Sequence, residues 1–206
     1  VFGLLVGLPA LRLRGESVSA DGYDQAKSVL KIVVGLAAMF EGIGILLLMF
    51  AFVPQFGPEG VWISVFTAIS AFCNAGFDLF GRFGAYSSLV PYVNNYYVQA
   101  VIIFMIISGG LGFMVWVELC QWYKKRRLSL HAKVVLFMSL VLTAAGTVLL
   151  KLTEDITWMG AFFTSVSART AGFSTFPLGS FSGAGLLTVI VLMVIGASPG
   201  STGGGI

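Results

Sequence analysis

The sequence predicts an all-α integral membrane protein built from repeated units. Of its 206 residues, 57% are hydrophobic and only 10% are charged, which is too little charge to cover a water-soluble domain of this length. Several apolar runs are long enough to cross a bilayer. Two shorter apolar segments lie between those runs, and each is followed by the tripeptide Ala-Gly-Phe. Together these observations predict spans that alternate with short helices entering the membrane without crossing it.

The chain is expected to divide into four parts. Residues 1–28 would hold the tail of a preceding transmembrane helix and a cytoplasmic linker, and residues 29–123 a first complete unit. A basic cytoplasmic loop at 124–133 separates this unit from a second one at 134–206, which is truncated in its last helix. Because the chain begins without Met and stops inside a glycine-rich stretch, we expect it to be an internal fragment.

The apolar runs that predict spans lie at 29–53, 98–123 and 132–150, each reaching the roughly 20 residues that cross a bilayer. The segments 61–73 and 157–168 are shorter. As helices they would measure about 20 Å, against a hydrocarbon thickness of roughly 30 Å. We therefore expect each of them to enter and leave the membrane on the same side.

The basic residues predict the orientation of the spans. Nine of the twelve Lys and Arg residues lie in two regions, one around the start of the first span and one at 124–133. Loops rich in Lys and Arg stay in the cytoplasm. The loop 124–133 is therefore predicted to be cytoplasmic, and Gly57 and Thr175 are predicted to be external.

The two short segments belong to an internal repeat. Aligning residues 61–77 with residues 157–173, at an offset of 96, gives five identical positions. The matched pairs are Trp62 with Trp158, Phe66 with Phe162, Ala75 with Ala171, Gly76 with Gly172 and Phe77 with Phe173. The shared spacing predicts a unit made of a span, a short pore helix, a glycine turn and a second span.

A glycine turn at membrane depth points to a pore. Non-helical backbone is tolerated there only where protein buries it or where it lines a water-filled cavity. A glycine permits conformations that turn carbonyl oxygens toward a central axis, where they can replace the hydration shell of an alkali cation. The negative end of the helix dipole favours a cation at the same place. The pattern therefore predicts a potassium-channel-like pore with Gly76 and Gly172 in its selectivity filter.

The last apolar segment is predicted to stop being helical inside the membrane. Every residue from Gly196 to Gly205 is small, and the stretch holds five glycines and Pro199. Glycine costs about 1 kcal/mol and proline about 3 kcal/mol in a helix interior, so a loop is favoured after Ile195. The alternative is a helix that packs closely through its small residues.

These motifs resemble those of the Trk/Ktr/HKT cation transporter superfamily, and most closely its KtrB-type subunit. The similar stretches are Ser-Ala-Phe-Cys-Asn-Ala-Gly-Phe-Asp-Leu-Phe-Gly at 70–81, Ala-Arg-Thr-Ala-Gly-Phe-Ser-Thr at 168–175, Leu-Ser-Leu-His at 128–131 and the decapeptide 196–205. Cys73 departs from the family pattern, in which a second Asn often stands. The resemblance implies four units around one pore, of which this chain holds only part.

The resemblance also implies the functional residues. Backbone carbonyls that bind potassium in the filter would come from Asn74, Ala75, Gly76, Phe77, Asp78, Thr170, Ala171, Gly172, Phe173 and Ser174. A gating loop beneath the filter would be formed by Gly196, Ala197, Ser198, Pro199, Gly200, Ser201, Thr202, Gly203, Gly204 and Gly205.

The function implied by the resemblance is potassium uptake across the plasma membrane by a multi-pass, pore-forming subunit in a bacterial cell membrane. This subunit would be a homodimer in the lipid bilayer, regulated by a cytosolic nucleotide-binding ring. The expected ligand is potassium, as the transported ion. No cofactor, resident metal or nucleic acid is expected. The sequence leaves open whether sodium is also carried, or is coupled to potassium uptake.

Two other functions are weighed against a pore. Residues 196–200 match G-x-S-x-G, which would make Ser198 the nucleophile of an intramembrane serine hydrolase. His131, the single histidine, is predicted to lie away from it in a cytoplasmic loop, so a partner base is lacking. A membrane scaffold without transport activity is the other alternative, and it does not account for the paired glycine turns.

Three ionisable residues lie close to the predicted membrane interior. Arg169 would repel cations inside a pore, so we expect it to point behind the turn toward a carboxylate or a carbonyl. Glu41, near the middle of a span, is expected to pair with another helix. Asp78 either concentrates cations at the outer mouth or is an ordinary solvated side chain.

Overall fold

A computed structural model describes residues 20–84, 87–125 and 127–204. It divides into two units, Val1–Met39 and Phe40–Ile206, which are treated separately below. Within the described residues the structure contains helices and no β-strand, which confirms the all-α prediction. The predicted tail of a preceding span, at the start of the chain, lies outside the described residues.

The first long helix, α2 (Ala20–Phe56), begins in one unit and ends in the other. Its part from Val29 to Phe56 has 28 residues and is apolar enough to cross a membrane. At 1.5 Å per residue that part measures about 42 Å, more than the thickness of the hydrocarbon layer. A helix at 29–53 is therefore confirmed, and it extends beyond these residues at both ends.

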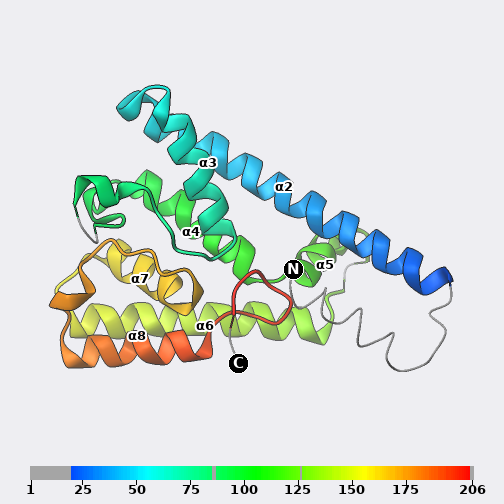
Figure 1. Ribbon diagram of the computed structural model, residues 1–206. Helices are drawn as coiled ribbons and strands as arrows, with labels where there is room; N and C mark the ends of the chain where they lie inside the picture. The colour runs from blue at the N-terminus through cyan, green and yellow to red at the C-terminus, as the bar shows by residue number, and fades with distance from the viewer. Residues whose placement is uncertain (1–19, 85–86, 126, 205–206) are drawn as a thin grey trace. The chain divides into compact units, whose positions relative to one another are not determined.

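The next part of the second unit runs from a short helix to a bent pair of helices (Figure 1). Helix α3 (Glu59–Phe72) has 14 residues and is too short to cross a bilayer. Two 3₁₀ turns, Phe80–Phe83 and Val90–Tyr92, lead to α4 (Tyr96–Gly110), which is followed by α5 (Phe113–Lys125). Each 3₁₀ turn contributes one aromatic ring, Phe80 or Tyr92, that packs against Phe52 of α2. The rings meet edge to face or tilted, with centroids 5.2–5.6 Å apart.

The span predicted at 98–123 is not a single continuous helix. Helices α4 and α5 are bent by 97° at Leu111 and Gly112. Gly112 has a φ of +91°, a conformation that costs glycine little and most other residues more. The bend also frees backbone groups at the break, and Phe113 N donates to the carbonyl of Gly200 at 3.1 Å. Distant residues thus provide the hydrogen bonds that a continuous helix would have made within itself.

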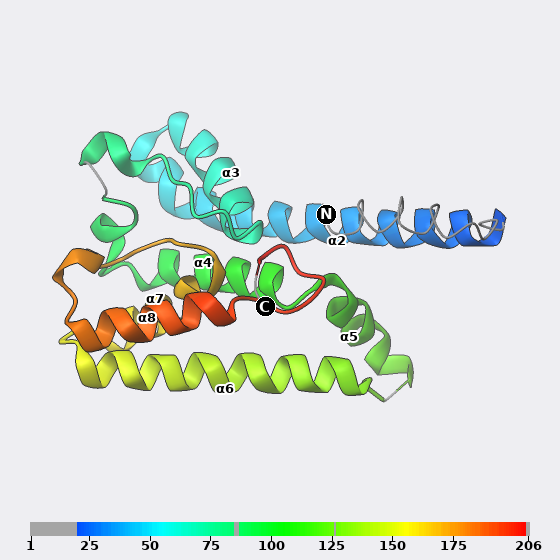
Figure 2. The same ribbon diagram turned by 60° about the horizontal axis from the view of Figure 1, so that its bottom comes forward.

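Three helices complete the second unit: α6 (Leu130–Thr153), α7 (Trp158–Thr170) and α8 (Gly183–Ile195). Each begins at a Ser or Thr whose hydroxyl accepts a hydrogen bond from a backbone N–H in the first turn, an arrangement that favours helix initiation. The short α7 packs against α4, α6 and α8, and Figure 2 shows α6 and α8 lying side by side. Helix α7 covers the predicted segment 157–168 except for Thr157, which is its N-cap, and ends two residues later.

The chain leaves helical geometry at Ile195, as predicted. Gly196 follows with a φ of +69°, and residues 197–204 form a loop, drawn in red beside the α4–α5 bend in Figure 1. Gly205, the last residue of the predicted gating loop, lies outside the described residues. We call residues 196–204 the intramembrane loop, after the position that the sequence predicts for them.

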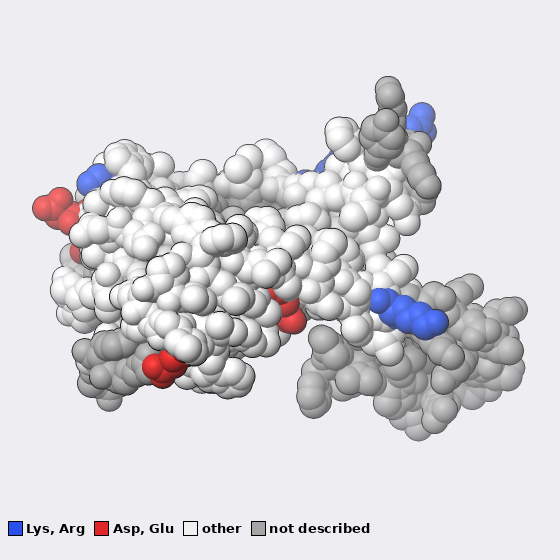
Figure 3. Space-filling view, turned by 90° about the horizontal axis from the view of Figure 1, so that it is seen from above, with Lys and Arg blue, Asp and Glu red and all other residues white. Residues whose placement is uncertain are grey.

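The surface has the composition expected of a protein in lipid. Two described helices, α2 from Val29 onward and α6, are long and apolar enough to cross a membrane, and the bent pair α4 and α5 makes a third if it is one span. Helix α6 exposes large apolar side chains, among them Phe137 and Leu140 at 64% and 70% exposure. Figure 3 shows few charged side chains on the face that it presents.

Candidate functional site

Two glycine turns follow the short helices α3 and α7. We call residues 74–78 the first glycine turn and residues 170–174 the second. Gly76 has a φ of +73° and Gly172 a φ of +86°, so both occupy the left-handed region that favours glycine. The chain therefore reverses at equivalent positions of the two aligned segments.

Each turn is closed by a serine of the helix that precedes it. Ser70 Oγ donates to the carbonyl of Phe77 at 2.7 Å, and the carbonyl of Ser70 accepts from Ala75 N. Ser167 Oγ donates to the carbonyl of Phe173 at 2.6 Å, and the carbonyl of Ser167 accepts from Gly172 N. These bonds fix the direction in which the backbone leaves each turn, a role that the sequence alone did not assign to either serine.

The two glycine turns lie against each other. Thr170 Oγ1 donates to Asn74 Oδ1 at 3.1 Å, and these two residues occupy equivalent positions of the repeat. A Cβ added to Gly76 would overlap the carbonyl oxygen of Ala171. Only a residue without a side chain fits there, because backbone occupies the space that a side chain would need.

Residues 88 and 89, which follow the first glycine turn, make hydrogen bonds with the last residue of the second glycine turn. Leu89 N donates to the carbonyl of Ser174 at 2.9 Å, and Ser174 N donates to Ser88 Oγ at 3.2 Å. Thr175, which was predicted to be external, has a fully buried side chain beside this contact region. The segment after the first glycine turn thus makes hydrogen bonds with the second glycine turn.

The intramembrane loop is held at the α4–α5 bend. Ser198 N and Thr202 N donate to the successive carbonyls of Gly110 and Gly109, at 3.2 and 3.1 Å. Ala197 N donates to the carbonyl of Gly204 at 2.8 Å, which closes the loop on itself. The loop therefore occupies a defined place, even though its sequence favours no regular structure.

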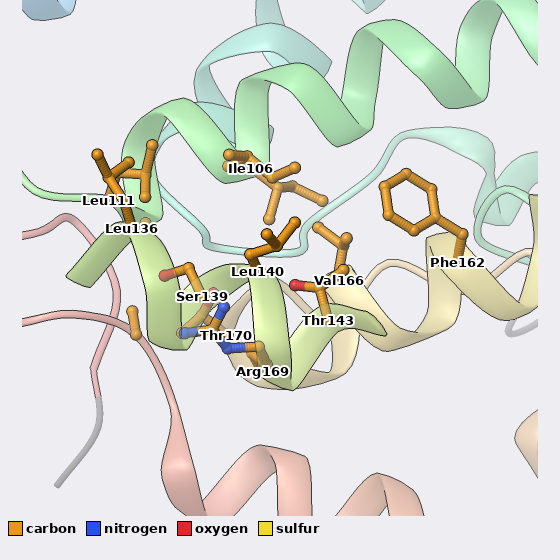
Figure 4. A pocket seen from close by; sticks show the side chains of 13 residues that line it. Ile106, Leu111, Leu136, Ser139, Leu140, Thr143, Phe162, Val166, Arg169 and Thr170 are labelled. Atoms are coloured by element: carbon orange, nitrogen blue, oxygen red, sulfur yellow. The ribbon is translucent and has the colours of Figure 1, made fainter. Parts of the chain in front are cut away.

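Arg169 lies behind the second glycine turn and contacts the loop. Its Nε donates to the carbonyl of Gly196 at 3.0 Å, which confirms the prediction that it points to a carbonyl. The side chain borders a cavity of about 240 Å³ lined mostly by apolar residues of α4, α6 and α7, with Ile106, Leu140 and Val166 among them (Figure 4). This places the guanidinium between α7 and the start of the loop.

The other ionisable candidates have local partners. Asp78 Oδ1 accepts from Phe80 N at 2.9 Å and so stabilises the backbone just after the first turn. Glu41 Oε1 lies 3.8 Å from the thiol of Cys73, at the end of α3, in line with the expected pairing to another helix. Across residues 20–84, 87–125 and 127–204, no group of three His, Cys, Asp or Glu side chains forms a metal site.

The described residues form helices and no strand, and two of these helices are long and apolar enough to cross a membrane, which is typical of integral membrane proteins. The family model that matches it is TrkH, described as cation transport protein, over residues 11–154 and 130–206. The chain therefore belongs to the TrkH family of cation transport proteins.

The relatives have names that agree with this family. The chain is 36% identical to potassium/sodium uptake protein NtpJ of Enterococcus hirae, over 91% of the chain and 44% of the relative. It is 36% identical to Ktr system potassium uptake protein B of Vibrio alginolyticus and 31% identical to that of Bacillus subtilis, in both cases over 100% of the chain and 48% of the relative. The chain thus spans about half the length of these curated relatives.

Membership of a transporter family means that the chain is not an enzyme, and the serine hydrolase alternative has no support. Ser198 lies in the intramembrane loop, where its backbone N–H binds Gly110. His131 lies in the first turn of α6. Among the described residues no hydrogen bond joins Ser198 to His131, so the two do not form a nucleophile activated by its base.

Proposed function

We propose that this chain forms part of a potassium-conducting pore that takes up potassium across the plasma membrane, with its two glycine turns as two segments of one selectivity filter. The observation that carries this proposal is the contact of the two turns, in which equivalent residues Asn74 and Thr170 share a hydrogen bond. Segments that surround one pore are expected to meet at equivalent positions of their repeats, whereas unrelated turns are not. Rubidium influx in Gly76 and Gly172 variants of the full-length protein is the experiment that tests it.

Some backbone carbonyls of the two glycine turns already accept hydrogen bonds, and the others are the better candidates to face the ion. Those of Phe77, Phe173 and Ser174 already accept hydrogen bonds from Ser70, Ser167 and Leu89. No hydrogen bond from the described residues reaches the other backbone carbonyls of the predicted filter, those of Asn74, Ala75, Gly76, Asp78, Thr170, Ala171 and Gly172. We expect these to replace most of the water that a potassium ion loses.

The intramembrane loop would act as the gate. It is bound to the end of α4, where Gly109 approaches Asn74 of the first turn, and to Arg169, which immediately precedes the second turn. Hydrogen bonds to backbone contribute about 1 kcal/mol each, so a few of them can be exchanged when the loop moves. We propose that a cytosolic nucleotide-binding ring regulates a homodimer of the full-length subunit, because the motifs of this chain resemble those of the Trk/Ktr/HKT superfamily.

The orientation of the chain can be tested by cysteine labelling from outside intact cells. The native Cys73 and Cys120 are exposed and are first replaced by Ala. We expect an impermeant thiol reagent to label Gly179→Cys, at an exposed position after the second turn, and to spare Arg127→Cys in the basic loop. The reverse pattern would overturn the proposed topology. Gly179 replaces Thr175 as the test position because Thr175 is buried.

Arg169→Ala in the full-length protein is expected to raise potassium uptake in the absence of the regulator. The variant removes the hydrogen bond to Gly196, and bonds of charged donors contribute about 1.5 to 3 kcal/mol, so a rise of about tenfold is expected. Arg169→Lys keeps the charge but loses the Nε–H, and should also raise uptake. Uptake per transporter that stays at the wild-type level in both variants would show that Arg169 does not restrain the loop.

A further inference from the structure

One side chain joins three separate segments at the base of the proposed filter. Asn74 Nδ2 donates to Thr202 Oγ1 of the intramembrane loop at 2.8 Å and to the carbonyl of Phe72 at 3.4 Å. Its Oδ1 accepts from Thr170 Oγ1. Both N–H groups and the oxygen of this amide are therefore used, by partners that belong to α3, to the second glycine turn and to the loop.

The hydroxyl of Thr202 completes the arrangement. It accepts from Asn74 and donates to the carbonyl of Phe72 at 2.7 Å, so that one carbonyl binds both side chains. The backbone of Thr202 is held at the same place, since its N–H donates to Gly109. We call Asn74, Thr170 and Thr202 the polar junction.

The surroundings of the polar junction leave little room for rearrangement. Asn74 is 8% exposed and has a φ of +52°, which is uncommon for a residue other than glycine. A Cβ added to Gly109 would overlap the carbonyl of Phe72 and crowd both Thr202 and Asn74. The backbone of α4 thus approaches as closely as glycine allows, and the junction is packed from behind.

We infer that the polar junction couples the gate to the filter, so that Asn74 and Thr202 are positioning residues for ion selectivity. The inference rests on the proposed function. If the Thr202 hydroxyl is lost from this place, the buried amide of Asn74 loses one of its three hydrogen bonds. Asn74 immediately precedes Ala75 and Gly76, whose carbonyls are proposed to face the ion. A filter formed in this way keeps its selective geometry only while Thr202 stays hydrogen-bonded to Asn74, whether or not the tip of the loop moves.

The test uses two variants of Thr202 in the full-length protein, one that loses the hydroxyl and one that keeps it. Thr202→Val keeps the shape of the side chain and removes both of its hydrogen bonds, whereas Thr202→Ser keeps them. We expect Thr202→Val to lower the preference for rubidium over sodium in influx measurements by about five-fold, the change that corresponds to one ordinary hydrogen bond. Thr202→Ser should behave as wild type.

A matched control and a double variant separate coupling from general damage. Thr188→Val removes a hydroxyl from α8 that binds only the carbonyl of Ala184 in the same helix, and it should leave the ion preference unchanged. Asn74→Ala combined with Thr202→Val should change the ion preference by less than the product of the two single effects, because both variants break the same bond.

The outcomes distinguish this inference from the proposed function. If Thr202→Val keeps the wild-type ion preference while Gly76→Asp abolishes influx, the pore assignment stands and the coupling is wrong. A lower amount of Thr202→Val in the membrane, with an unchanged ratio of rubidium to sodium influx per transporter, would give Thr202 a structural role only and would also overturn the coupling. If Gly76→Asp leaves influx intact, the proposed function itself fails.

Discussion

Replacing Gly76 by Asp in the full-length protein is expected to abolish potassium uptake. The new Cβ would overlap the carbonyl oxygen of Ala171, and the residue would be held at a φ of +73°. Both effects displace the backbone of two turns at once, since the first turn rests on the second. The measurement is rubidium influx in cells that lack other potassium uptake systems, normalised to the amount of protein in the membrane.

Substitutions at Gly172 provide the matched comparison. Gly172 also has a positive φ, but a Cβ there would have no atom within 4 Å, so only the backbone conformation opposes it. We therefore expect Gly172→Ser to retain measurable influx with weaker discrimination against sodium, and Gly76→Ser to be the more damaging of the two. Gly172→Asp should abolish influx as Gly76→Asp does. Normal rubidium influx in both Asp variants, at normal expression, would show that these glycines do not line a pore.

Deleting the tip of the intramembrane loop, Pro199 to Ser201, is expected to raise flux several-fold in the absence of the regulator. The flanking residues Ser198 and Thr202 bind successive carbonyls of α4, so the shortened chain is joined between two anchored points. The filter should be unaffected, because its carbonyls come from separate turns and Thr202 is retained. The deletion removes one described bond to another helix, from Phe113 N to the carbonyl of Gly200.

A structural role for this loop predicts a different result. If the loop is needed to hold α4, α5 and α8 together, its deletion exposes backbone groups inside the membrane at a cost of several kcal/mol each. The variant would then be poorly expressed and would conduct nothing, and the gate hypothesis would be wrong. Measuring the amount of folded protein by detergent extraction and size-exclusion chromatography, alongside influx, distinguishes the two cases.

The sequence was most informative about the helices that face lipid, because lipid requires every backbone polar group to be hydrogen-bonded within the protein. Apolar run length predicted the helices at 29–53 and 132–150 and the two short helices, because lipid allows few alternatives. The small residues after Ile195 predicted the loop by their helix propensity alone. These features depend on neighbouring residues, and so they can be recognised in a single stretch of sequence.

The remaining features depend on contacts between distant residues. The bend at Gly112 was missed because the apolar pattern of 98–123 is the same for a straight helix, while the partner of the freed Phe113 N–H lies at Gly200. The contact of Asn74 with Thr202 joins residues 128 positions apart, and no local pattern indicates it. A serine shortly before each glycine turn was a visible signal, but its role required the geometry.

The contact between the glycine turns has a consequence for engineering this protein from its relatives. The basic linker near Arg127 looks like the natural place to join one repeat to the next from another transporter. A chimera cut there would take Asn74 from one parent and Thr170 from the other, and would place Gly76 against a foreign Ala171. The smallest exchangeable module is therefore the pair of turns with residues 87–92 and the intramembrane loop, and single repeats should transfer poorly even between close homologues.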